Sequence, residues 1–423
     1  MKIITVRDTD STIESLRPKP NKELKQRVLS IISNVQSSGD KALREYERRF
    51  NKVNLHSLKV SKAEIKKAYS QVSQEEINAI KIAKNRLEKS ENAVKKQLRN
   101  ISLLNEGVRI SKVFSSIYSV GCYIPGGKAR YPSTVIMSVI PAKVAGVKKI
   151  IAVSPANQTG TVDPLTLVAA DICGVDEFYK MGGAQAIAAL AYGTKSIPKV
   201  DKIVGPGGTF VTTAKSLLSD VVSIDMIAGP TELAIIGDSS TDPDLVAFDL
   251  ISQAEHSIDT MCCLITTSRK LKEQVIFSLQ KKMEGLKRSE IVKESLRKNG
   301  FIAICKDEEQ VIEFTNKLAP EHLEIMIKNP KSIAKKITSA GLTLIGKNTP
   351  SSASDYLLGS NHILPTNGFG KTRGSLGVLD YLKIETKIET SKAALERISK
   401  YMKALTDAEG LPNHFEAVKR RLI

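Results

Sequence analysis

Short apolar runs alternate with amphipathic stretches from about residue 115 to about residue 345. Runs such as KKIIAVSP, DKIVGP, ELAIIGD and CCLITT are rich in β-branched residues, and stretches with helical spacing separate them. Continuous apolar runs predict strands that are buried on both faces, as in parallel sheets. The alternation therefore predicts an α/β fold with doubly wound parallel sheets, and its length favours two such sheets over one.

The first 110 residues have a different pattern, with apolar positions at helical spacing on otherwise basic stretches. In the segment 61–98, Ile77, Ile80, Ala83 and Leu87 recur every three or four residues, which predicts helices. Residues 1–110 carry 24 Lys and Arg against 13 Asp and Glu, so +11 of the net charge of +18 lies there. We expect solvated basic helix faces, with nucleic-acid affinity or attraction of an anionic cofactor as alternatives.

The composition limits the class of protein. With 423 residues, 41% of them apolar and 26% charged, the chain can form two to four folding units. The start, MKIITVRDTD, has no apolar leader, so we expect a cytoplasmic protein. The five cysteines are irregularly spaced and indicate neither a disulfide framework nor a thiolate zinc site. The absence of Trp argues against a surface on which the bases of single-stranded nucleic acid could stack.

Glycine-rich turns follow several strand-like runs, at residues 124–132, 181–186, 205–210 and 228–232. Ligands in doubly wound sheets collect beyond the carboxyl ends of strands, and glycine lets backbone N–H groups approach a phosphate or carboxylate. The chain has no G-x-G-x-x-G fingerprint and no G-x-x-x-x-G-K-[ST] loop. A dinucleotide would therefore bind without the standard motif.

Histidines and their neighbours give four candidate clusters. Gln253 and His256 lie three apart near the end of a helix that we expect Asp242 and Pro243 to begin, and a structural capping role for His256 is an equal alternative. In LAPEHLEIM, Glu321 and His322 occupy a turn into a strand, where a His beside a carboxylate suits general-base catalysis.

The other two clusters lie closer to the carboxyl terminus. Asp355 and His362 belong to SDYLLGSNHILPTNGFG, and Glu409 and His414 belong to DAEGLPNHFEAV. An amide, a carboxylate and imidazoles form a plausible ligand set for Zn²⁺ or another divalent ion. Spacing alone does not assemble them, because the clusters are far apart along the chain.

The sequence as a whole resembles histidinol dehydrogenases. The resemblance rests on VGCYIPGGKARYPSTVIMSVIPAKVAGV, GGAQAIAALAYGT, VDKIVGPGG, IDMIAGPTE, QAEH, APEHLE, SDYLLGSNHILPT and GLPNHFEAV, which occur in the family's order over nearly the whole chain. It implies a zinc-containing, NAD-dependent enzyme that oxidises L-histidinol through histidinal to L-histidine. It also implies a homodimer with exchanged tails.

The resemblance assigns roles to individual positions. Its zinc ligands correspond to Gln253, His256, Asp355 and His414, and its acid/base pair corresponds to Glu321 and His322. Its substrate contacts correspond to Thr231, Gln253, His256, His322, Asp355, His362, Glu409 and His414, and its NAD contacts to Tyr123, Gln185 and Gly208. Glu409 and His414 would come from the other subunit. No nucleophilic cysteine is needed, although Cys122 beside Tyr123 is the residue that could support a cysteine route.

Three positions depart from the family's usual pattern. Gly208 stands where Asn is usual, which removes a side-chain hydrogen bond to NAD, while Thr231 replaces Ser and Ser354 replaces Gly. We expect an arm over 1–20, a first α/β domain over 21–120 and 233–376, an NAD-side domain over 121–232, and an exchanged helical tail over 377–423. The alternatives are a related dehydrogenase acting on another small alcohol and a basic nucleic-acid-binding protein.

Overall fold

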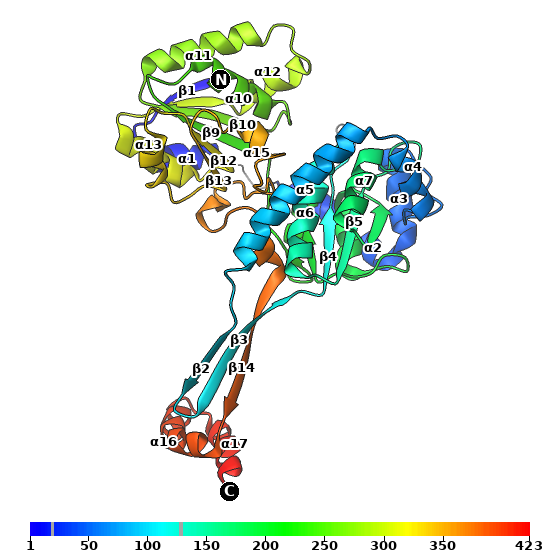
Figure 1. Cartoon of the computed structure of the whole chain (residues 1–423), viewed down its shortest axis with the longest axis vertical. Helices are drawn as coiled ribbons and strands as arrows, with labels where there is room; N and C mark the ends of the chain where they lie inside the picture. Colours follow the sequence, from blue (N-terminus) through cyan, green and yellow to red (C-terminus); the bar gives the residue numbers. More distant parts are fainter. Residues whose placement is uncertain (18–20, 127–129) are drawn as a thin grey trace.

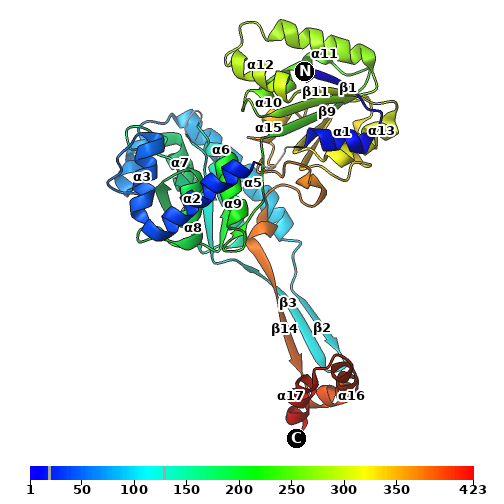
Figure 2. The same cartoon turned by 180° about the vertical axis from the view of Figure 1, so that it is seen from behind.

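Two parallel sheets, each with helices on both faces, form the body of the protein. The computed structural model describes residues 1–17, 21–126 and 130–423. A third, antiparallel sheet extends from the body as a stalk that ends in two helices (Figures 1 and 2). The predicted α/β class with two doubly wound parallel sheets is therefore confirmed.

The first sheet has six parallel strands in the order β1-β11-β10-β9-β12-β13. Its strands are β1 (Lys2–Thr5), β9 (Glu232–Gly237), β10 (Met261–Thr266), β11 (Phe301–Ile304), β12 (His322–Ile325) and β13 (Leu342–Ile345). One face packs on α10 (Pro243–Ala254), α11 (Arg269–Lys282) and α12 (Ser289–Lys298), and the other on α1 (Thr9–Leu16), α13 (Glu308–Leu318) and α14 (Pro330–Ala334). All six residues of β9 are buried, as expected for a central strand of a parallel sheet.

The second sheet has five parallel strands in the order β6-β5-β4-β7-β8. Its strands are β4 (Ser119–Tyr123), β5 (Lys149–Ser154), β6 (Glu177–Lys180), β7 (Lys202–Val204) and β8 (Ser223–Ile224). One face packs on α4 (Lys62–Tyr69), α5 (Gln74–Lys95), α6 (Pro132–Ala145) and α7 (Pro164–Cys173), and the other on α2 (Lys22–Ser38), α3 (Asp40–Asn51), α8 (Gly183–Tyr192) and α9 (Thr209–Leu217).

Local signals explain where several helices begin. Ser61 and Ser73 each start a helix with a capping box. The Ser side chain accepts from the backbone N–H of the Glu three residues later, and the side chain of that Glu accepts from the backbone N–H of the Ser. Asp242 accepts a hydrogen bond from the N–H of Asp244 and Pro243 occupies the first turn of α10, so the predicted start of this helix is confirmed. Phe248 lies on the exposed side of α10.

The packing of the amino-terminal third differs from the grouping that the sequence analysis expected. Helices α2 to α5 contact α6, α7, α8 and α9, so they cover the second sheet and not the first. The amino-terminal arm instead contributes β1 to the first sheet, where it pairs with β11. Amphipathic periodicity shows that a helix has an apolar face but not which sheet covers it. The exact domain limits stay a prediction.

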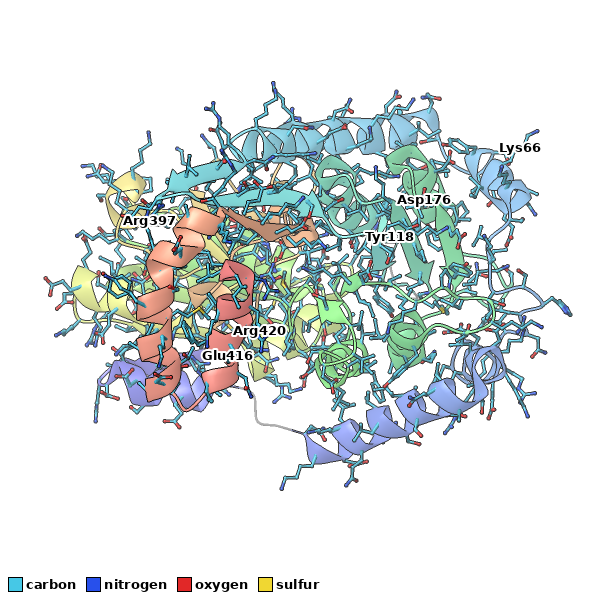
Figure 3. The ribbon with its side chains drawn as sticks, turned by 90° about the horizontal axis from the view of Figure 1, so that it is seen from below. Lys66, Tyr118, Asp176, Arg397, Glu416 and Arg420 are labelled. Carbon is cyan, nitrogen blue, oxygen red and sulfur yellow. The ribbon has the colours of Figure 1, made fainter. Side chains whose placement is uncertain are left out.

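The stalk consists of β2 (Ile101–Asn105), β3 (Val108–Ser116) and β14 (Leu382–Thr390), none of which the sequence analysis predicted. At its far end lie α16 (Lys392–Ala408) and α17 (Pro412–Leu422), which form the expected helical tail. Figure 3 looks along the stalk, with Arg397 on α16 and Glu416 and Arg420 on α17. Among the described residues, no helix combines the length and apolarity needed to cross a bilayer.

Candidate active site

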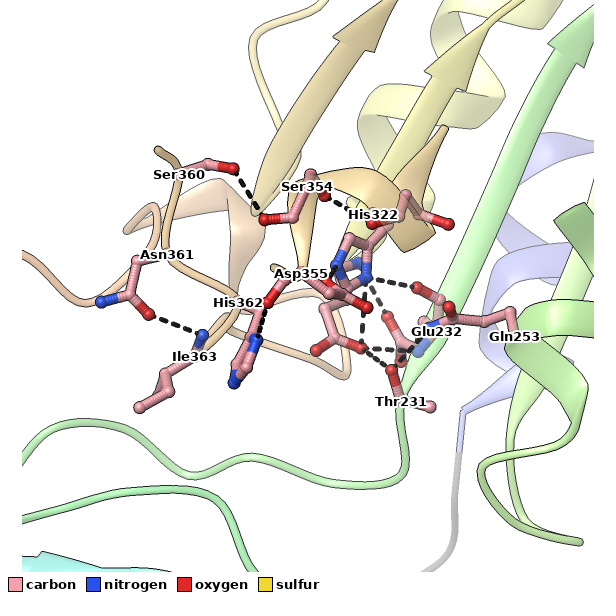
Figure 4. Close-up of polar contacts among 12 residues, drawn as sticks. Thr231, Glu232, Gln253, His322, Ser354, Asp355, Ser360, Asn361, His362 and Ile363 are labelled. Carbon is pink, nitrogen blue, oxygen red and sulfur yellow. Dashed lines mark hydrogen bonds and ion pairs between the residues drawn. The ribbon is translucent and has the colours of Figure 1, made fainter. Parts of the chain in front are cut away.

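The candidate residues gather at the amino-terminal ends of two neighbouring strands of the first sheet. Glu232 is the first residue of β9 and His322 the first of β12, and β9 and β12 pair in parallel. Glu321 and Thr231 directly precede these strands, and Asp355 ends the short helix α15 (Ser351–Ser354) beside them (Figure 4). These candidate residues therefore lie at the amino ends of their strands, whereas the sequence analysis expected ligand-binding groups beyond the carboxyl ends.

Hydrogen bonds fix the orientation of the His322 ring. Its Nδ1 lies 3.3 Å from the carbonyl oxygen of Glu232 and its Nε2 lies 3.3 Å from Oδ1 of Asp355. A carbonyl oxygen can only accept, so Nδ1 carries a proton. Burial lowers the pKa of His322, but the Glu321 and Asp355 carboxylates outweigh it and raise this pKa to about 9.

A chain of hydrogen bonds links Gln253 to Glu321. Nε2 of Gln253 donates to Oγ1 of Thr231 at 2.8 Å, and Oγ1 of Thr231 donates to Oε2 of Glu321 at 2.6 Å. The same carboxylate oxygen accepts from the N–H of Glu232 at 2.6 Å. Because the amide nitrogen of Gln253 is engaged in this chain, its Oε1 is the atom available for a cation or a substrate. Burial raises the pKa of Glu321 above its ordinary value.

Three imidazoles lie near Asp355, and one of them, His322, is hydrogen-bonded to its carboxylate. Burial raises the pKa of Asp355, but the hydrogen bond with His322 and the nearby rings of His362 and His256 outweigh burial and keep it below its usual value. Nδ1 of His362 donates to the backbone oxygen of Asp355 at 2.8 Å, which leaves Nε2 of His362 as the ring atom for other partners. His256 lies just beyond α10, two residues after its last residue, with an exposed side chain.

The structure does not bring all of the predicted ligands together in one chain. Glu409 ends α16 and His414 lies in the first turn of α17, and both side chains are exposed at the far end of the stalk (Figure 1). Within residues 1–17, 21–126 and 130–423, no three His, Cys, Asp or Glu side chains lie in an arrangement that could hold a metal ion. The remaining candidates are Gln253, His256 and Asp355. Their side chains offer the nitrogen and oxygen donors that Zn²⁺ binds.

The predicted cofactor contacts lie at the carboxyl ends of strands in the second sheet, as expected. Tyr123 ends β4, and its buried hydroxyl accepts from the N–H of Gly183 at 3.1 Å. Gln185 lies in the first turn of α8 and is also buried. Glu47 of α3 accepts from the N–H of Gly182 at 3.1 Å and from Nε2 of Gln185 at 3.4 Å, so it fixes this turn. The glycine-rich turn at 124–132 lies partly outside the described residues.

A buried ion pair holds the next glycine-rich turn. Lys215 and Asp225 pair with almost no exposure, while Lys215 donates to the carbonyl oxygen of Gly205 at 3.0 Å and Asp225 accepts from its N–H at 2.8 Å. Gly205 has φ of +113°, which only glycine adopts readily. Gly208 has φ of −65° and directly precedes α9 with no side-chain cap, so any residue could occupy its backbone conformation.

Two residues of these sites were missed by the sequence analysis. Glu232 orients His322 through its carbonyl oxygen, and its side chain accepts from the N–H groups of Glu321 and Asn367. Burial, reinforced by the Glu321 carboxylate, raises the pKa of Glu232 to about 8. A charged first position in the otherwise apolar run ELAIIG was the available signal. Nothing in the sequence around Glu47 indicated a role, because its burial depends on the packing of α3 against α8.

A cavity of about 480 Å³ lies along the first sheet and is lined by residues of β1, α1 and α12, together with Glu232 and with Thr209, the first residue of α9. Its volume is in the range of small-molecule sites. Cys122 is fully buried, and burial raises the pKa of its thiol far above the ordinary value, so this cysteine is unsuited to nucleophilic catalysis. Cys262 and Cys263 are core residues.

Comparison with known proteins assigns this arrangement to a family. A family model described as histidinol dehydrogenase matches residues 16–422. The histidinol dehydrogenase of Methanocaldococcus jannaschii is 42% identical over 96% of this chain and 94% of its own, and that of Caldanaerobacter subterraneus subsp. tengcongensis is 45% identical over 95% and 93%. The crystal structure of histidinol dehydrogenase from Elizabethkingia anophelis superposes with a TM-score of 0.93 at 35% identity, covering 100% of this chain and 98% of that one. The chain belongs to the histidinol dehydrogenase family.

Proposed function

We propose that this protein oxidises L-histidinol through histidinal to L-histidine with two NAD⁺, the last step of histidine biosynthesis. The observation that carries the proposal is the orientation of His322, whose Nδ1–H is held by the Glu232 carbonyl. Nε2 is thereby directed at the carboxylate of Asp355. A ring held in this way can take a proton at one defined atom. Family membership disfavours both a different alcohol as substrate and a nucleic-acid-binding role.

His322 and Glu321 would divide the proton transfers. Because its pKa is raised to about 9, His322 carries a proton on Nε2 as well at neutral pH and donates it to Asp355. Nε2 takes the hydroxyl proton of the alcohol after it has released this proton to solvent and exchanged its hydrogen bond with Asp355 for one with the substrate. Glu321, held through Oε2 by Thr231 and the N–H of Glu232, activates the water that hydrates the aldehyde. His322 releases the first proton to solvent and then takes a second proton, from the hydrate. NAD⁺, when bound, supplies the hydride acceptor in both oxidations.

We further propose that Gln253, His256 and Asp355, with His414 of the partner subunit, would hold one Zn²⁺. The free Oε1 of Gln253 and the carboxylate of Asp355 support this assignment, because both supply oxygen donors, with Gln253 bonded to Thr231 and Asp355 to His322. A bound Zn²⁺ supplies Lewis-acid binding of the substrate's imidazole and amine, which orients the carbinol carbon. His362 and Thr231 would contact the same substrate, and Tyr123, Gln185 and Gly208 would contact NAD.

The stalk supports a homodimer in which the tail completes the site of the other subunit. Glu409 and His414 are exposed and far from Asp355 in one chain. The stalk and its helices also expose large apolar side chains, among them Leu104, Ile388, Tyr401 and Leu405, which are 60%, 65%, 64% and 64% accessible. Several large, exposed apolar side chains on one extension of the fold favour a protein interface there.

The test is NADH formation from L-histidinol by the purified protein. We expect two NADH per histidinol, with the rate lost on chelation, restored by zinc and abolished in His322→Ala. Reduction of NAD⁺ with another amino alcohol but not with histidinol would contradict the substrate assignment. Activity that survives both chelation and His322→Ala would contradict the mechanism.

Subunit mixing tests the composite site. His414→Ala and His322→Ala dimers should each be inactive, and a refolded equimolar mixture should recover about a quarter of the wild-type activity, since half of the dimers then carry one intact site. A mixture that stays inactive while size-exclusion chromatography shows dimers would refute donation of His414 across the interface.

A further inference from the structure

Asn361 is a buried amide that has no part in the proposed mechanism. It is 2% exposed and directly precedes His362 (Figure 4). Its Oδ1 accepts from the N–H of Ile363 at 2.9 Å, and its Nδ2 donates to the backbone oxygen of Met137 at 2.8 Å. A carbonyl oxygen can only accept and an N–H can only donate, so the amide has one orientation that makes both bonds. The side chain therefore joins the backbone on the far side of His362 to α6.

The carbonyl of Met137 is one that its own helix cannot satisfy in the usual way. Pro141 lies inside α6, four residues after Met137. Proline has no N–H, so the helical hydrogen bond to the carbonyl oxygen four residues earlier cannot form. Met137 is 2% exposed, and a buried carbonyl without a donor costs free energy. Nδ2 of Asn361 supplies the missing donor, and the hydroxyl of Tyr381 donates to the next carbonyl, that of Ser138, at 2.7 Å.

His362 lies where the backbone passes from the first sheet to the helices of the second. Nδ1 of His362 donates to the backbone oxygen of Asp355 at 2.8 Å, and the side chain of Asp355 bonds to His322. Ile363, the next residue, is 1% exposed and belongs to the apolar core that also contains Met137. The bonds of Asn361 are therefore made at the point where the two halves of the body meet beside a candidate substrate contact.

We propose that Asn361 is a positioning residue, whose amide fixes the backbone on both sides of His362 by supplying the hydrogen-bond donor that Pro141 removes from α6. The bond to α6 sets where the segment lies, and the bond to Ile363 sets the turn of the backbone at His362. Because Nδ1 of His362 is engaged with Asp355, a shift of this backbone would redirect Nε2, the ring atom left for a substrate. The positioning half of the proposal rests on the proposed function, in which His362 contacts histidinol, whereas the bond to α6 does not.

Thermal unfolding tests the bond to α6. Asn361→Leu removes the partners of two buried groups, the carbonyl of Met137 and the N–H of Ile363, and should lower Tm by at least about 2 °C. Pro141→Ala returns a helical N–H to that carbonyl, so Asn361→Leu then leaves only the N–H of Ile363 without its partner. In the Pro141→Ala background, the loss of Tm should therefore fall to about half.

Asn316 provides the matched control, because its amide makes the same two kinds of bond away from α6. Its Nδ2 donates to the backbone oxygen of Lys336 at 3.1 Å, and its Oδ1 accepts from the N–H of Thr338 at 2.8 Å. Asn316→Leu should lower Tm equally in the wild-type and Pro141→Ala backgrounds. Equal losses in the two backgrounds for Asn361→Leu would overturn the bond to the carbonyl that Pro141 leaves free.

Steady-state kinetics test the positioning. Asn361→Leu should raise the KM for histidinol about two- to twelvefold, the effect of one net hydrogen bond, and leave the KM for NAD⁺ unchanged. Adding Pro141→Ala should recover Tm in part but not the KM for histidinol, because it restores a bond within α6 and none to the backbone at His362. In a His362→Ala background, Asn361→Leu should not change this KM further, because it acts through that ring.

Two outcomes would overturn the positioning role. One is recovery of the KM for histidinol together with Tm in Pro141→Ala/Asn361→Leu, and the other is a further rise of this KM in the His362→Ala background. A wild-type protein inactive with histidinol would refute the proposed function and the positioning with it, and the comparison of Tm values would still decide the bond to α6.

Discussion

Replacing Gly208 with Asn should tighten NAD⁺ binding, because the structure has room for the side chain that the family usually has there. A Cβ at Gly208 would meet no heavy atom within 4 Å, and its φ of −65° suits any residue. One net hydrogen bond contributes about 0.5 to 1.5 kcal/mol, which corresponds to an approximately two- to twelvefold lower Kd. Isothermal titration calorimetry with NAD⁺ measures this directly.

A competing use of the new side chain can be told apart from cofactor binding. Gly208 is the N-cap of α9, and an Asn there could instead accept from the N–H groups of the first turn, stabilising the helix by a few tenths of a kcal/mol over Gly. Capping alone would raise Tm without changing the Kd for NAD⁺. Gly208→Ala is the matched control, since it adds a Cβ and no hydrogen-bonding group.

The contrast with the neighbouring glycines sharpens the test. Gly207→Ala should weaken binding or stability, because its Cβ would collide with the side chain of Val211. Gly205→Ala should do so more strongly, because its positive φ is strained for Ala and its Cβ would collide with the backbone of Tyr123. An Asn at position 208 that binds NAD⁺ no better than Ala would refute the idea that this position faces the cofactor.

Three further predictions concern the buried charges and the base. Lys215→Met should lower the free energy of unfolding by about 3 to 5 kcal/mol in urea titrations, because Asp225 stays buried without its partner, and Lys215→Met/Asp225→Leu should recover part of the loss. His322→Gln should lower kcat about 10²- to 10⁴-fold with an unchanged Kd for NAD⁺, and a smaller loss would refute its role as the base. The pKa of Glu177 is lowered to about 2, because hydrogen bonds from Lys149 and other donors outweigh the effect of burial. Glu177→Gln should therefore lower the free energy of unfolding at neutral pH, and this difference from wild type should vanish as pH falls from 4.5 toward about 2 in urea titrations. A difference that is constant with pH would refute this prediction.

The candidate site could be predicted residue by residue but not as an arrangement. Sequence patterns and the family resemblance singled out Glu321, His322 and Asp355, and the structure places them in contact. The tautomer of His322 could not be predicted, because it depends on the carbonyl of Glu232, a residue 90 positions away. The distance of Glu409 and His414 from the other candidates could not be predicted either, because it depends on the position of the stalk, at whose far end both residues lie.

The position of the site at the amino-terminal ends of the strands also depends on tertiary structure. The sequence shows that Glu321 and His322 enter a strand, but the edge of the sheet on which they meet other groups follows from strand order. Strand β12 pairs with β9, which lies far from it in sequence, and this pairing brings Glu232 and Thr231 to Glu321.

The sequence by itself determined the elements whose causes are local. The alternation of apolar runs and helical stretches, and the start of α10 at Asp242 and Pro243, act within a few residues and were confirmed. The stalk strands β2, β3 and β14 were decided only by the tertiary structure. The side chains of β2 and β14 are largely exposed and those of β3 are at most half-buried, so no strand has a buried face to impose a period of two. The tertiary structure likewise decided which sheet α2 to α5 pack on, because an apolar stripe shows that one face of a helix is buried but not which element buries it.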